Sequence, residues 1–416
     1  MTMQTNMDRE AKAILLANDR GGYTIPTEGL YPYQWNWDSA FAALGFAEFD
    51  LARAWEELET LFLGQWSDGM VPHIIFHKPD PRYFPGPDVW GGIGPIPSSG
   101  ITQPPIAPVF ARRIYEKNPE VGLAKVKALY PKMVAWMDWF MAWRLDQGAV
   151  CTTHPWESGR DNSPDWDTAM NLIDPVDVGE YQRRDLSHVD ADMRPKKWDY
   201  DRYIWLVNQG RNNDWDQEKL LESNPFRVAD PTMTFTVMRA MRDVIALGEI
   251  IGADVSKQIT DLEVLEAGAE TIWNTELGAY DARTVATGSF TGVASNASFL
   301  CWYGGLKAER ALTRLDKTLA KTPYPVPSHD PDSPRFDAMR YWRGPSWGFM
   351  NMLIGLGLEE QGHAQSDQIR LATRRLIGDY GFAEYFNPLT GAPAGGQSFT
   401  WTAAVWLTWA SPTKEV

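Results

Sequence analysis

The chain has 416 residues, of which 39 are basic and 54 are acidic, so its formal net charge at pH 7 is −15. A charge of this sign repels nucleic acid and anionic membranes, and neither is expected as a partner. The 20 tryptophans exceed what a core of this size needs, and such bulky, partly exposed side chains are typical of a lined cavity.

Two cysteines, Cys151 and Cys301, provide neither a disulfide framework nor a cysteine-based zinc site. The first twelve residues are polar and contain no apolar signal-peptide core, and no apolar run of membrane-spanning length follows. These features predict a soluble cytoplasmic protein, unless a signal peptide has already been removed from the chain.

Apolar residues recur with helical spacing through most of the chain. The first stripe is Trp37, Ala40, Phe41 and Leu44, and Asp50 is then expected to cap a second helix that Gly64 ends. Further helices are predicted after Pro131 and over residues 237–247, 262–273, 295–310, 347–358, 366–377 and 399–410. No long alternating pattern competes with them, so the chain is predicted to be mainly α-helical.

Long Pro- and Gly-rich connections separate these helices, notably residues 77–108 and 323–335. A length prior would divide the chain into two or three domains, but no change of composition marks a linker and the helices come in successive pairs. We therefore predict an all-α fold, a single (α/α)6 barrel over residues 1–416. The polar insertion 178–203 has too few apolar residues for a core of its own, and it is expected to cover the site together with residues 77–108.

Two acidic segments carry the strongest chemical signal. Residues 156–164 read Trp-Glu-Ser-Gly-Arg-Asp-Asn-Ser-Pro, which places Glu157 and Asp161 in a rigid turn, and Glu384 lies far downstream between aromatic residues. Either acid alone is more often an ion-paired or capping group. Two carboxylates supplied separately in aromatic surroundings are what glycoside hydrolysis requires, so the pair favours a glycosidase.

A third acid, Asp38, follows Trp35 and Trp37 at the start of the first predicted helix. Its carboxylate is suited to accept hydrogen bonds from sugar hydroxyls while the indoles cover the apolar face of the ring. The alternative is an acid that the helix dipole favours at this position. Arg343, in Trp-Arg-Gly-Pro-Ser-Trp, is equally open between a ligand and a buried structural arginine.

Other motifs indicate a substrate charge and exclude some chemistries. Residues 194–200 concentrate three cations, and Arg194 with Tyr200 suits an anionic small substrate, although a solvated loop is the commoner origin of such a cluster. His73 and His77 are spaced i, i+4 but have no obvious third ligand, so structural histidines are favoured over a metal site. No phosphate cradle or Gly-X-Ser-X-Gly elbow is present, and no metal or cofactor is expected.

Five motifs together resemble glycoside hydrolase family 63. They are, in order, Tyr-Gln-Trp-Asn-Trp-Asp-Ser-Ala-Phe at 33–41, Gly-Met-Val-Pro-His at 69–73, the acid motif at 157–164, Tyr-Trp-Arg-Gly-Pro-Ser-Trp at 341–347 and Phe-Ala-Glu-Tyr at 382–385. Its length and its lack of an added β-sandwich domain make the chain most similar to the bacterial mannosylglycerate and glucosylglycerate hydrolases of that family, which are single (α/α)6 barrels.

The resemblance implies an inverting hydrolase that cleaves a 2-O-α-glycosyl-D-glycerate, with Asp161 as general acid and Glu384 as general base. The two carboxyl groups of such a site stand about 6.5–9.5 Å apart. Burial and neighbours such as Glu157 are expected to raise the pKa of Asp161. The implied substrate-binding residues are Tyr31, Trp35, Trp37, Asp38, Tyr83, Gln103, Arg194, Tyr200, Tyr341, Trp342, Trp347 and Gln397.

Three alternatives stay open at this point. An α-glucosidase of neutral di- or oligosaccharides would have no use for Arg194. A sugar 2-epimerase would place histidines rather than Asp161 and Glu384 in the cavity, and a non-catalytic sugar-binding protein would have no reason to keep both carboxylate loops. The choice between gluco and manno substrates and the oligomeric state are left open.

Overall fold

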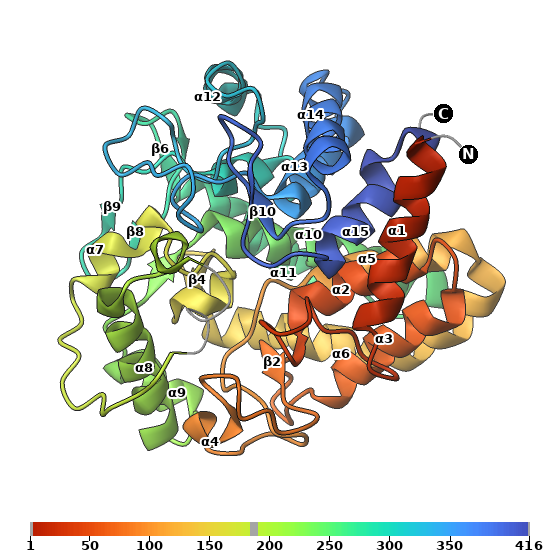
Figure 1. Cartoon of the computed structure of the whole chain (residues 1–416). Coiled ribbons are helices and arrows are strands. Elements are labelled where there is room, and N and C mark those ends of the chain that lie inside the picture. The colour runs from red at the N-terminus through yellow and green to blue at the C-terminus, as the bar shows by residue number, and fades with distance from the viewer. Residues whose placement is uncertain (1–2, 184–189, 415–416) are drawn as a thin grey trace.

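The structure is a computed structural model that describes residues 3–183 and 190–414. It is mostly helical, and its strands are short (Figure 1). The prediction of a mainly α-helical fold is confirmed. In the described part of the chain, none of the helices combines the length and the apolar character needed to cross a bilayer.

Six elements within the described residues form a closed inner ring. They are α2 (Asn36–Phe46), α5 (Ile106–Lys117), α10 (Pro231–Ile251), the 3-10 helix η5 (Asn296–Cys301), α13 (Gly348–Glu360) and α15 (Thr400–Val405). Neighbours in this order touch in turn, and α15 packs back onto α2, so the ring closes.

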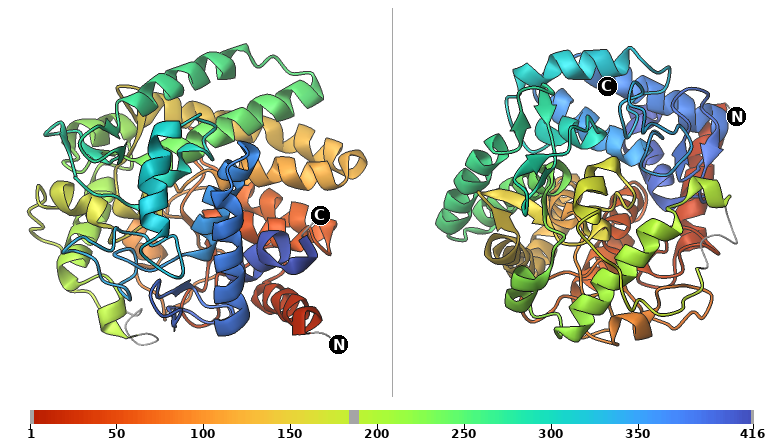
Figure 2. Two further views of the ribbon diagram at one scale, coloured as in Figure 1. Left: turned by 90° about the horizontal axis from the view of Figure 1, so that it is seen from above. Right: turned by 90° about the vertical axis from the view of Figure 1, so that its left-hand side faces the viewer.

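The outer elements alternate with the inner ones along the chain. They are α1 (Met3–Asn18), α3 (Leu51–Leu63), α6 (Pro119–Trp143), α11 (Ser256–Glu270), α12 (Glu309–Leu319) and α14 (Gln365–Tyr380). Each packs on an inner helix next to it in the ring, except α12, which lies beside β7 (Ala279–Tyr280). Helices from all parts of the chain surround the centre of the molecule (Figure 2). The predicted (α/α)6 barrel is confirmed.

The remaining elements lie in the connections between the ring helices and after the last of them. The helical ones are α4 (Pro87–Trp90), η1 (Pro155–Ser158), η2 (Pro164–Trp166), α7 (Asp167–Met170), η4 (Ala191–Met193), α8 (Lys197–Asn212), α9 (Gln217–Ser223), the π-helical turn η6 (Trp406–Ala410) and η7 (Pro412–Lys414).

The strands form small antiparallel sheets. The largest has the order β3 (Leu145–Asp146), β4 (Ala149–Thr152), β5 (Val228–Ala229), β8 (Arg283–Thr284) and β9 (Ser289–Phe290). The other pairs are β1 (Gln34–Trp35) with β2 (Ile74–Ile75), β6 (Trp273–Asn274) with β7, and β10 (Tyr385–Phe386) with β11 (Pro393–Ala394).

Local chemistry explains several helix boundaries. Asp50 caps α3 as predicted, since its side chain accepts a hydrogen bond of 3.0 Å from the backbone N–H of Arg53. Asp230 caps α10 in the same way, accepting from the backbone of Thr232 and Met233 at 3.1 Å each. These caps satisfy backbone donors that have no partner inside the helix.

Three boundary predictions are wrong. Pro131 lies inside α6 rather than before it, because apolar burial on both sides of the proline outweighs the one hydrogen bond that it removes. The helix expected over 295–310 is only η5, because the chain turns at Gly305, whose φ is +90°. The insertion 178–203 is not loop throughout, since its last residues form the start of α8; residues 184–189 lie outside the described part.

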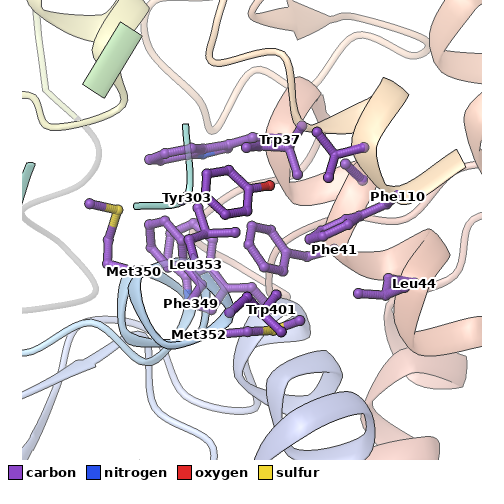
Figure 3. Packing of buried hydrophobic residues seen from close by; sticks show 14 of the residues in the cluster. Trp37, Phe41, Leu44, Phe110, Tyr303, Phe349, Met350, Met352, Leu353 and Trp401 are labelled. Atoms are coloured by element: carbon purple, nitrogen blue, oxygen red, sulfur yellow. The ribbon is translucent and has the colours of Figure 1, made fainter. Parts of the chain in front are cut away.

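The middle of the ring is filled with aromatic side chains (Figure 3). The rings of Phe41 and Phe110 lie 5.0 Å apart, those of Trp37 and Phe349 4.7 Å, and those of Phe349 and Trp401 4.5 Å, between centroids. These residues come from four inner helices, and all are buried. The barrel axis is therefore packed, and Trp37 and Trp401 also line a cavity next to this packed centre.

Candidate active site

A cavity of about 760 Å³, including its mouth, brings together eleven of the fourteen predicted site residues. They are Tyr31, Trp35, Trp37, Asp38, Tyr83, Gln103, Asp161, Arg194, Tyr200, Tyr341 and Glu384. The predicted covering segments contribute Arg82, Tyr83 and Phe84 from one side and Arg194 from the other. Residues up to 353 positions apart in the sequence therefore meet at one place.

The loop that carries Asp161 passes close to the floor of this cavity. It follows η1, which ends at Gly159 with a φ of +69°. A Cβ atom at this position would lie 2.2 Å from Cζ2 of Trp37, so only glycine fits both the backbone conformation and the space. Gly159 thus lets the chain run against Trp37 immediately before Asp161.

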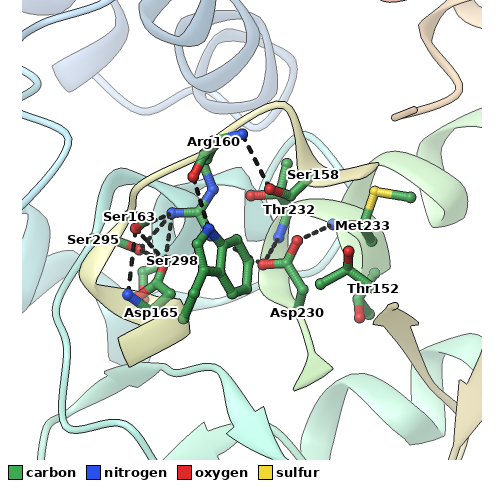
Figure 4. Close-up of polar contacts among 12 residues, drawn as sticks. Thr152, Ser158, Arg160, Ser163, Asp165, Asp230, Thr232, Met233, Ser295 and Ser298 are labelled. Atoms are coloured by element: carbon green, nitrogen blue, oxygen red, sulfur yellow. Dashed lines mark hydrogen bonds and ion pairs between the residues drawn. The ribbon is translucent and has the colours of Figure 1, made fainter. Parts of the chain in front are cut away.

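Arg160 anchors this loop to the inner ring (Figure 4). Its side chain is fully buried, its Nη2 lies 3.0 Å from Oδ1 of Asp230, and its Nη1 forms an ion pair with Asp165. Nη1 also donates to Oγ of Ser295 at 3.3 Å. Because Asp230 is the cap of α10, the guanidinium ties the loop directly to an inner helix.

Further contacts fix the backbone around Asp161. The hydroxyl of Tyr203, on α8, donates to the Asp161 carbonyl at 2.7 Å. Oδ1 of Asn162 accepts from the backbone N–H of Trp342 at 2.9 Å. Since Arg160 and Asn162 are both directed into the protein, the side chain between them is the one that lines the cavity.

Glu157 supports this loop from behind. It is fully buried, its Oε1 lies 2.9 Å from Nη2 of Arg144, and its Oε2 accepts from the backbone N–H of Thr153 at 2.7 Å. It does not line the cavity. Glu157 therefore forms an ion pair with Arg144, and its expected effect on the pKa of Asp161 stays a prediction.

Glu384 immediately precedes β10 and is fully buried. Its Oε1 accepts from the hydroxyl of Tyr31 at 2.9 Å and lies 3.7 Å from Nη1 of Arg194. Its Oε2 accepts from the backbone N–H of Gly396 at 2.8 Å. Burial raises the pKa of Glu384, and the positive charge of Arg194, foremost, opposes that rise.

The cationic cluster separates into a buried and an exposed part. Arg194 is only 3% exposed, and its guanidinium lies over the ring of Tyr341, 4.2 Å from the centroid. Tyr200, on α8, also lines the cavity, whereas Lys196 and Lys197 are exposed. Of the three cations in the cluster, Arg194 therefore lies at the cavity, beside Glu384.

Asp38 lies in the first turn of α2 and is buried at the cavity. Its Oδ1 is buried and has no hydrogen-bond partner among residues 3–183 and 190–414. Burial, and then the charge of Glu384, raise the pKa of Asp38 well above its usual value. An unpartnered carboxylate oxygen next to a cavity is suited to bind a ligand hydroxyl.

Three predicted residues do not line the cavity. Trp342 and Trp347 are buried and stack on each other at 4.0 Å between centroids, and Nε1 of Trp347 donates to the carbonyl of Tyr341 at 3.2 Å. Both indoles pack edge-on against the ring of Tyr341 and hold it in place. The side chain of Gln397 is exposed, and its backbone carbonyl accepts from Oγ1 of Thr27 at 2.6 Å.

Arg343 is a structural arginine in this structure. It forms an ion pair with Asp167, and its Nη1 donates to Oδ2 of that residue at 3.2 Å. It is not among the residues that line the cavity.

The cavity also contains residues that were not predicted, among them His73, Trp156 and Trp401. His73 ends the Gly-Met-Val-Pro-His motif and Trp156 begins the acidic segment 156–164, so the sequence carried a signal for both. The spacing of His73 and His77 is not helical, because β2 lies between them, and Nε2 of His77 lies 2.7 Å from Oε1 of Gln34. The described residues hold no group of three or more His, Cys, Asp or Glu side chains placed to bind a metal ion.

The whole chain is similar to proteins of known activity. The sequence model of the family described as "Mannosylglycerate hydrolase MGH1-like glycoside hydrolase domain" matches residues 31–402. The chain is 43% identical to mannosylglycerate hydrolase MGH1 of Selaginella moellendorffii, over 98% of this chain and 86% of the relative. It is 33% identical to the glucosylglycerate hydrolase of Mycolicibacterium hassiacum, over 97% and 98%.

Solved structures agree with these sequence matches. The crystal structure of the GH63 mannosylglycerate hydrolase of Thermus thermophilus in complex with Tris and D-glycerate has a TM-score of 0.94 at 39% identity, covering 97% of this chain and 99% of that one. Neutral trehalase Nth1 of Saccharomyces cerevisiae has a TM-score of 0.57 at 14% identity and covers 92% of this chain and 72% of its own, which shows a common fold alone.

Proposed function

The chain belongs to glycoside hydrolase family 63, in its mannosylglycerate hydrolase MGH1-like group, and from this premise we propose that it hydrolyses a 2-O-α-glycosyl-D-glycerate, mannosyl or glucosyl, to hexose and D-glycerate. The observation that carries the proposal is the meeting of Asp161, Glu384 and Arg194 in one cavity. The two carboxylates are suited to act as acid and base in the hydrolysis, and the guanidinium is suited to bind the negative charge of the aglycone.

In the proposed mechanism Asp161 is the general acid. It gives its proton to the oxygen that joins the sugar to glycerate while the bond from that oxygen to the anomeric carbon breaks. Glu384 is the general base. It takes a proton from a water molecule whose oxygen bonds to the anomeric carbon from the opposite face, so an α-glycoside yields the β-hexose. Asp161 ends the step ionised and Glu384 ends it protonated.

The sugar ring is proposed to bind among Trp35, Trp37 and Asp38. The indoles cover its apolar face, and the free Oδ1 of Asp38 accepts from a ring hydroxyl. The aglycone is proposed to lie at Arg194 and Tyr200, where a guanidinium and a phenol are suited to a carboxylate. The Thermus relative, whose crystal structure contains D-glycerate, supports this aglycone.

A substrate panel tests the proposal. Purified enzyme is incubated separately with mannosylglycerate, glucosylglycerate and a neutral α-disaccharide, and released sugar is measured. We expect turnover of at least one glycerate, with the neutral sugar slower by at least tenfold. Asp161→Asn and Glu384→Gln are expected to abolish turnover and leave substrate binding nearly unchanged, because each keeps the shape but loses the proton transfer.

The opposite results have clear meanings. Faster cleavage of the neutral disaccharide would favour the α-glucosidase alternative, and wild-type kcat in either variant would refute the role given to that residue. The epimerase alternative is disfavoured, because the lining of the cavity includes both carboxylates and, of the five histidines that the structure describes, only His73. We also propose a cytoplasmic location, which the free and buried Cys151 and Cys301 support.

A further inference from the structure

We propose that Gly395 is a positioning residue for the base, and that the Gly395-Gly396 backbone forms a cradle that directs Oε1 of Glu384, rather than Oε2, toward the attacking water. This inference rests on the proposed function, because it presupposes that Glu384 is the general base. It adds a residue and an oxygen atom to that function.

The cradle is made of reciprocal hydrogen bonds. The backbone N–H of Glu384 donates to the carbonyl of Gly396 at 2.8 Å, and the backbone N–H of Gly396 donates to Oε2 of Glu384, also at 2.8 Å. The hairpin of β10 and β11, in which Tyr385 pairs with Ala394, brings the two segments together. One carboxylate oxygen is therefore held by the backbone.

The other carboxylate oxygen has different neighbours. Oε1 of Glu384 accepts from the hydroxyl of Tyr31 at 2.9 Å and lies 3.7 Å from Nη1 of Arg194, and all three residues line the cavity. The hydrogen bond from the backbone N–H of Gly396 to Oε2 thus sets the rotation of the carboxylate. Oε1 is the oxygen left to accept a proton from a water molecule in the cavity.

Gly395 leaves the space that this arrangement needs. Its φ is +71°, and a Cβ atom there would lie 2.3 Å from Oε2 and 2.8 Å from Cβ of Glu384. Real Cβ atoms essentially never approach other atoms to less than 3.0 Å, so Oε2 would have to retreat by at least about 0.7 Å. The same Cβ atom would lie 2.7 Å from Cε1 of Tyr385, but Oε2 is the nearest of these atoms and the end of a flexible side chain, so the base is the group that moves furthest.

The test is Gly395→Ala, with Gly252→Ala as its matched control. Gly252 ends α10 with a φ of +74°, so alanine suffers the same backbone strain there, but a Cβ atom would meet nothing within 4 Å. Both variants and the wild type are assayed with the glycerate substrate over a pH series, and thermal melting monitors the fold.

We expect Gly395→Ala to lower kcat about tenfold to a hundredfold with KM changed less than threefold, because a misplacement on the order of 1 Å costs about that much in a catalytic group. The acidic limb of kcat should also move to higher pH. Losing the Gly396 N–H bond disfavours the ionised base. The other charged or titratable neighbours of Glu384 are Arg194, Tyr31, Tyr341, Asp38 and Tyr385.

Gly252→Ala should match the wild type within twofold in kcat and in pH profile. If Gly395→Ala behaves as Gly252→Ala does, the cradle is refuted. Failure of the proposed function gives a different result. If Glu384→Gln is active, Glu384 is not the general base. If Glu384→Gln is inactive and Gly395→Ala is unaffected, only the cradle is refuted.

A second background covers the case in which Gly395→Ala does not fold. Glu384→Asp shortens the side chain and withdraws the carboxylate from the alanine methyl group. We expect the alanine to cost at least fivefold less in kcat, and less in melting temperature, in this background than in the wild type. Equal losses in both backgrounds, or failure to fold in both, would show that position 395 does not act through Glu384.

Discussion

At the residue scale, the two proposed catalytic acids are held in different ways. The protein fixes Asp161 through its backbone, since Arg160 and Asn162 are both bound inside the fold. It fixes Glu384 through its side chain, which receives hydrogen bonds on both oxygens.

Asp38 carries a prediction about stability. Burial and Glu384 raise its pKa well above the usual value, which returns to about 3.9 in the unfolded chain. Between these values the folded protein binds more protons than the unfolded one, so stability falls as pH rises. Asp38→Asn, which cannot ionise, should therefore raise the free energy of unfolding at pH 8 relative to the wild type.

The gain should shrink as the pH falls toward 4, because Asp38 is then protonated in the folded protein and about half protonated in the unfolded chain. Thermal melting of the wild type and the variant from pH 4 to pH 8 measures it, and turnover should fall in the same variant. Asp367→Asn, at a surface carboxylate on α14 that is 68% exposed, should show no such trend. A lower melting temperature of Asp38→Asn at pH 8 would contradict the prediction.

The motifs and the resemblance named eleven residues that line the cavity, but they did not give the orientation of every side chain. The two acids and Asp38 were predicted because few side chains can do their chemistry and the resemblance named their positions. Trp342 and Trp347 lie in the segment 341–347, of which only Tyr341 lines the cavity. A motif does not say which side each one takes, and here both indoles stack behind Tyr341.

At the element scale, the acid loop depends on one buried cation. Arg160→Met leaves Asp165 and Asp230 buried without their partner, and we expect it to lower the free energy of unfolding by about 3–5 kcal/mol. Arg370→Met removes an ion pair with Asp367 on the surface of α14 and should cost less than about 1 kcal/mol. Urea unfolding followed by fluorescence measures both, and similar losses would mean that Arg160 is not the anchor.

The segment before α8 is expected to select the charged aglycone. Arg194→Ala should raise KM and lower kcat/KM for the glycosylglycerate at least tenfold, since a charge-assisted hydrogen bond is worth about 1.5–3 kcal/mol. Activity on an uncharged aryl α-glycoside should hardly change. Rates should be compared on the pH plateau, because Arg194 also lies 3.7 Å from Glu384 and lowers its pKa.

Lys197→Ala is the control for the same segment, because this lysine is exposed and pairs with Asp201. It should leave both substrates unaffected. Equal losses on both substrates in Arg194→Ala would show that the arginine shapes the site generally, and an unchanged glycerate reaction would point back to a neutral α-glucosidase.

Helical stripes could be predicted from the sequence because apolar spacing directly reflects the buried face, as in α3 and α10. The boundaries of α6 and η5 could not, because they depend on packing that outweighs Pro131 and on the turn at Gly305. The start of α8 was also missed. Its first turn includes charged residues, so no apolar stripe marks the start. The helix contacts the acid loop through the hydrogen bond from Tyr203 to the Asp161 carbonyl.

At the scale of the whole molecule, closing the ring brings the two ends of the sequence to one site. Asn18 donates to Oγ1 of Thr400 at 3.0 Å, and α1 lies beside α15 (Figure 1). The contact between Tyr31 and Glu384 follows from that closure. Composition and periodicity predicted a toroid, and the family resemblance implied that both residues belong to the site, but the hydrogen bond between them was not predicted.

The central claim is that a glycosylglycerate is hydrolysed by a single displacement with inversion, and proton NMR of the early time course tests it most directly. With the 2-O-α-glycosyl-D-glycerate turned over in the panel, we predict equal amounts of D-glycerate and of the β-anomer of the hexose before mutarotation. Release of the α-anomer first, or hexose without glycerate, would contradict this account.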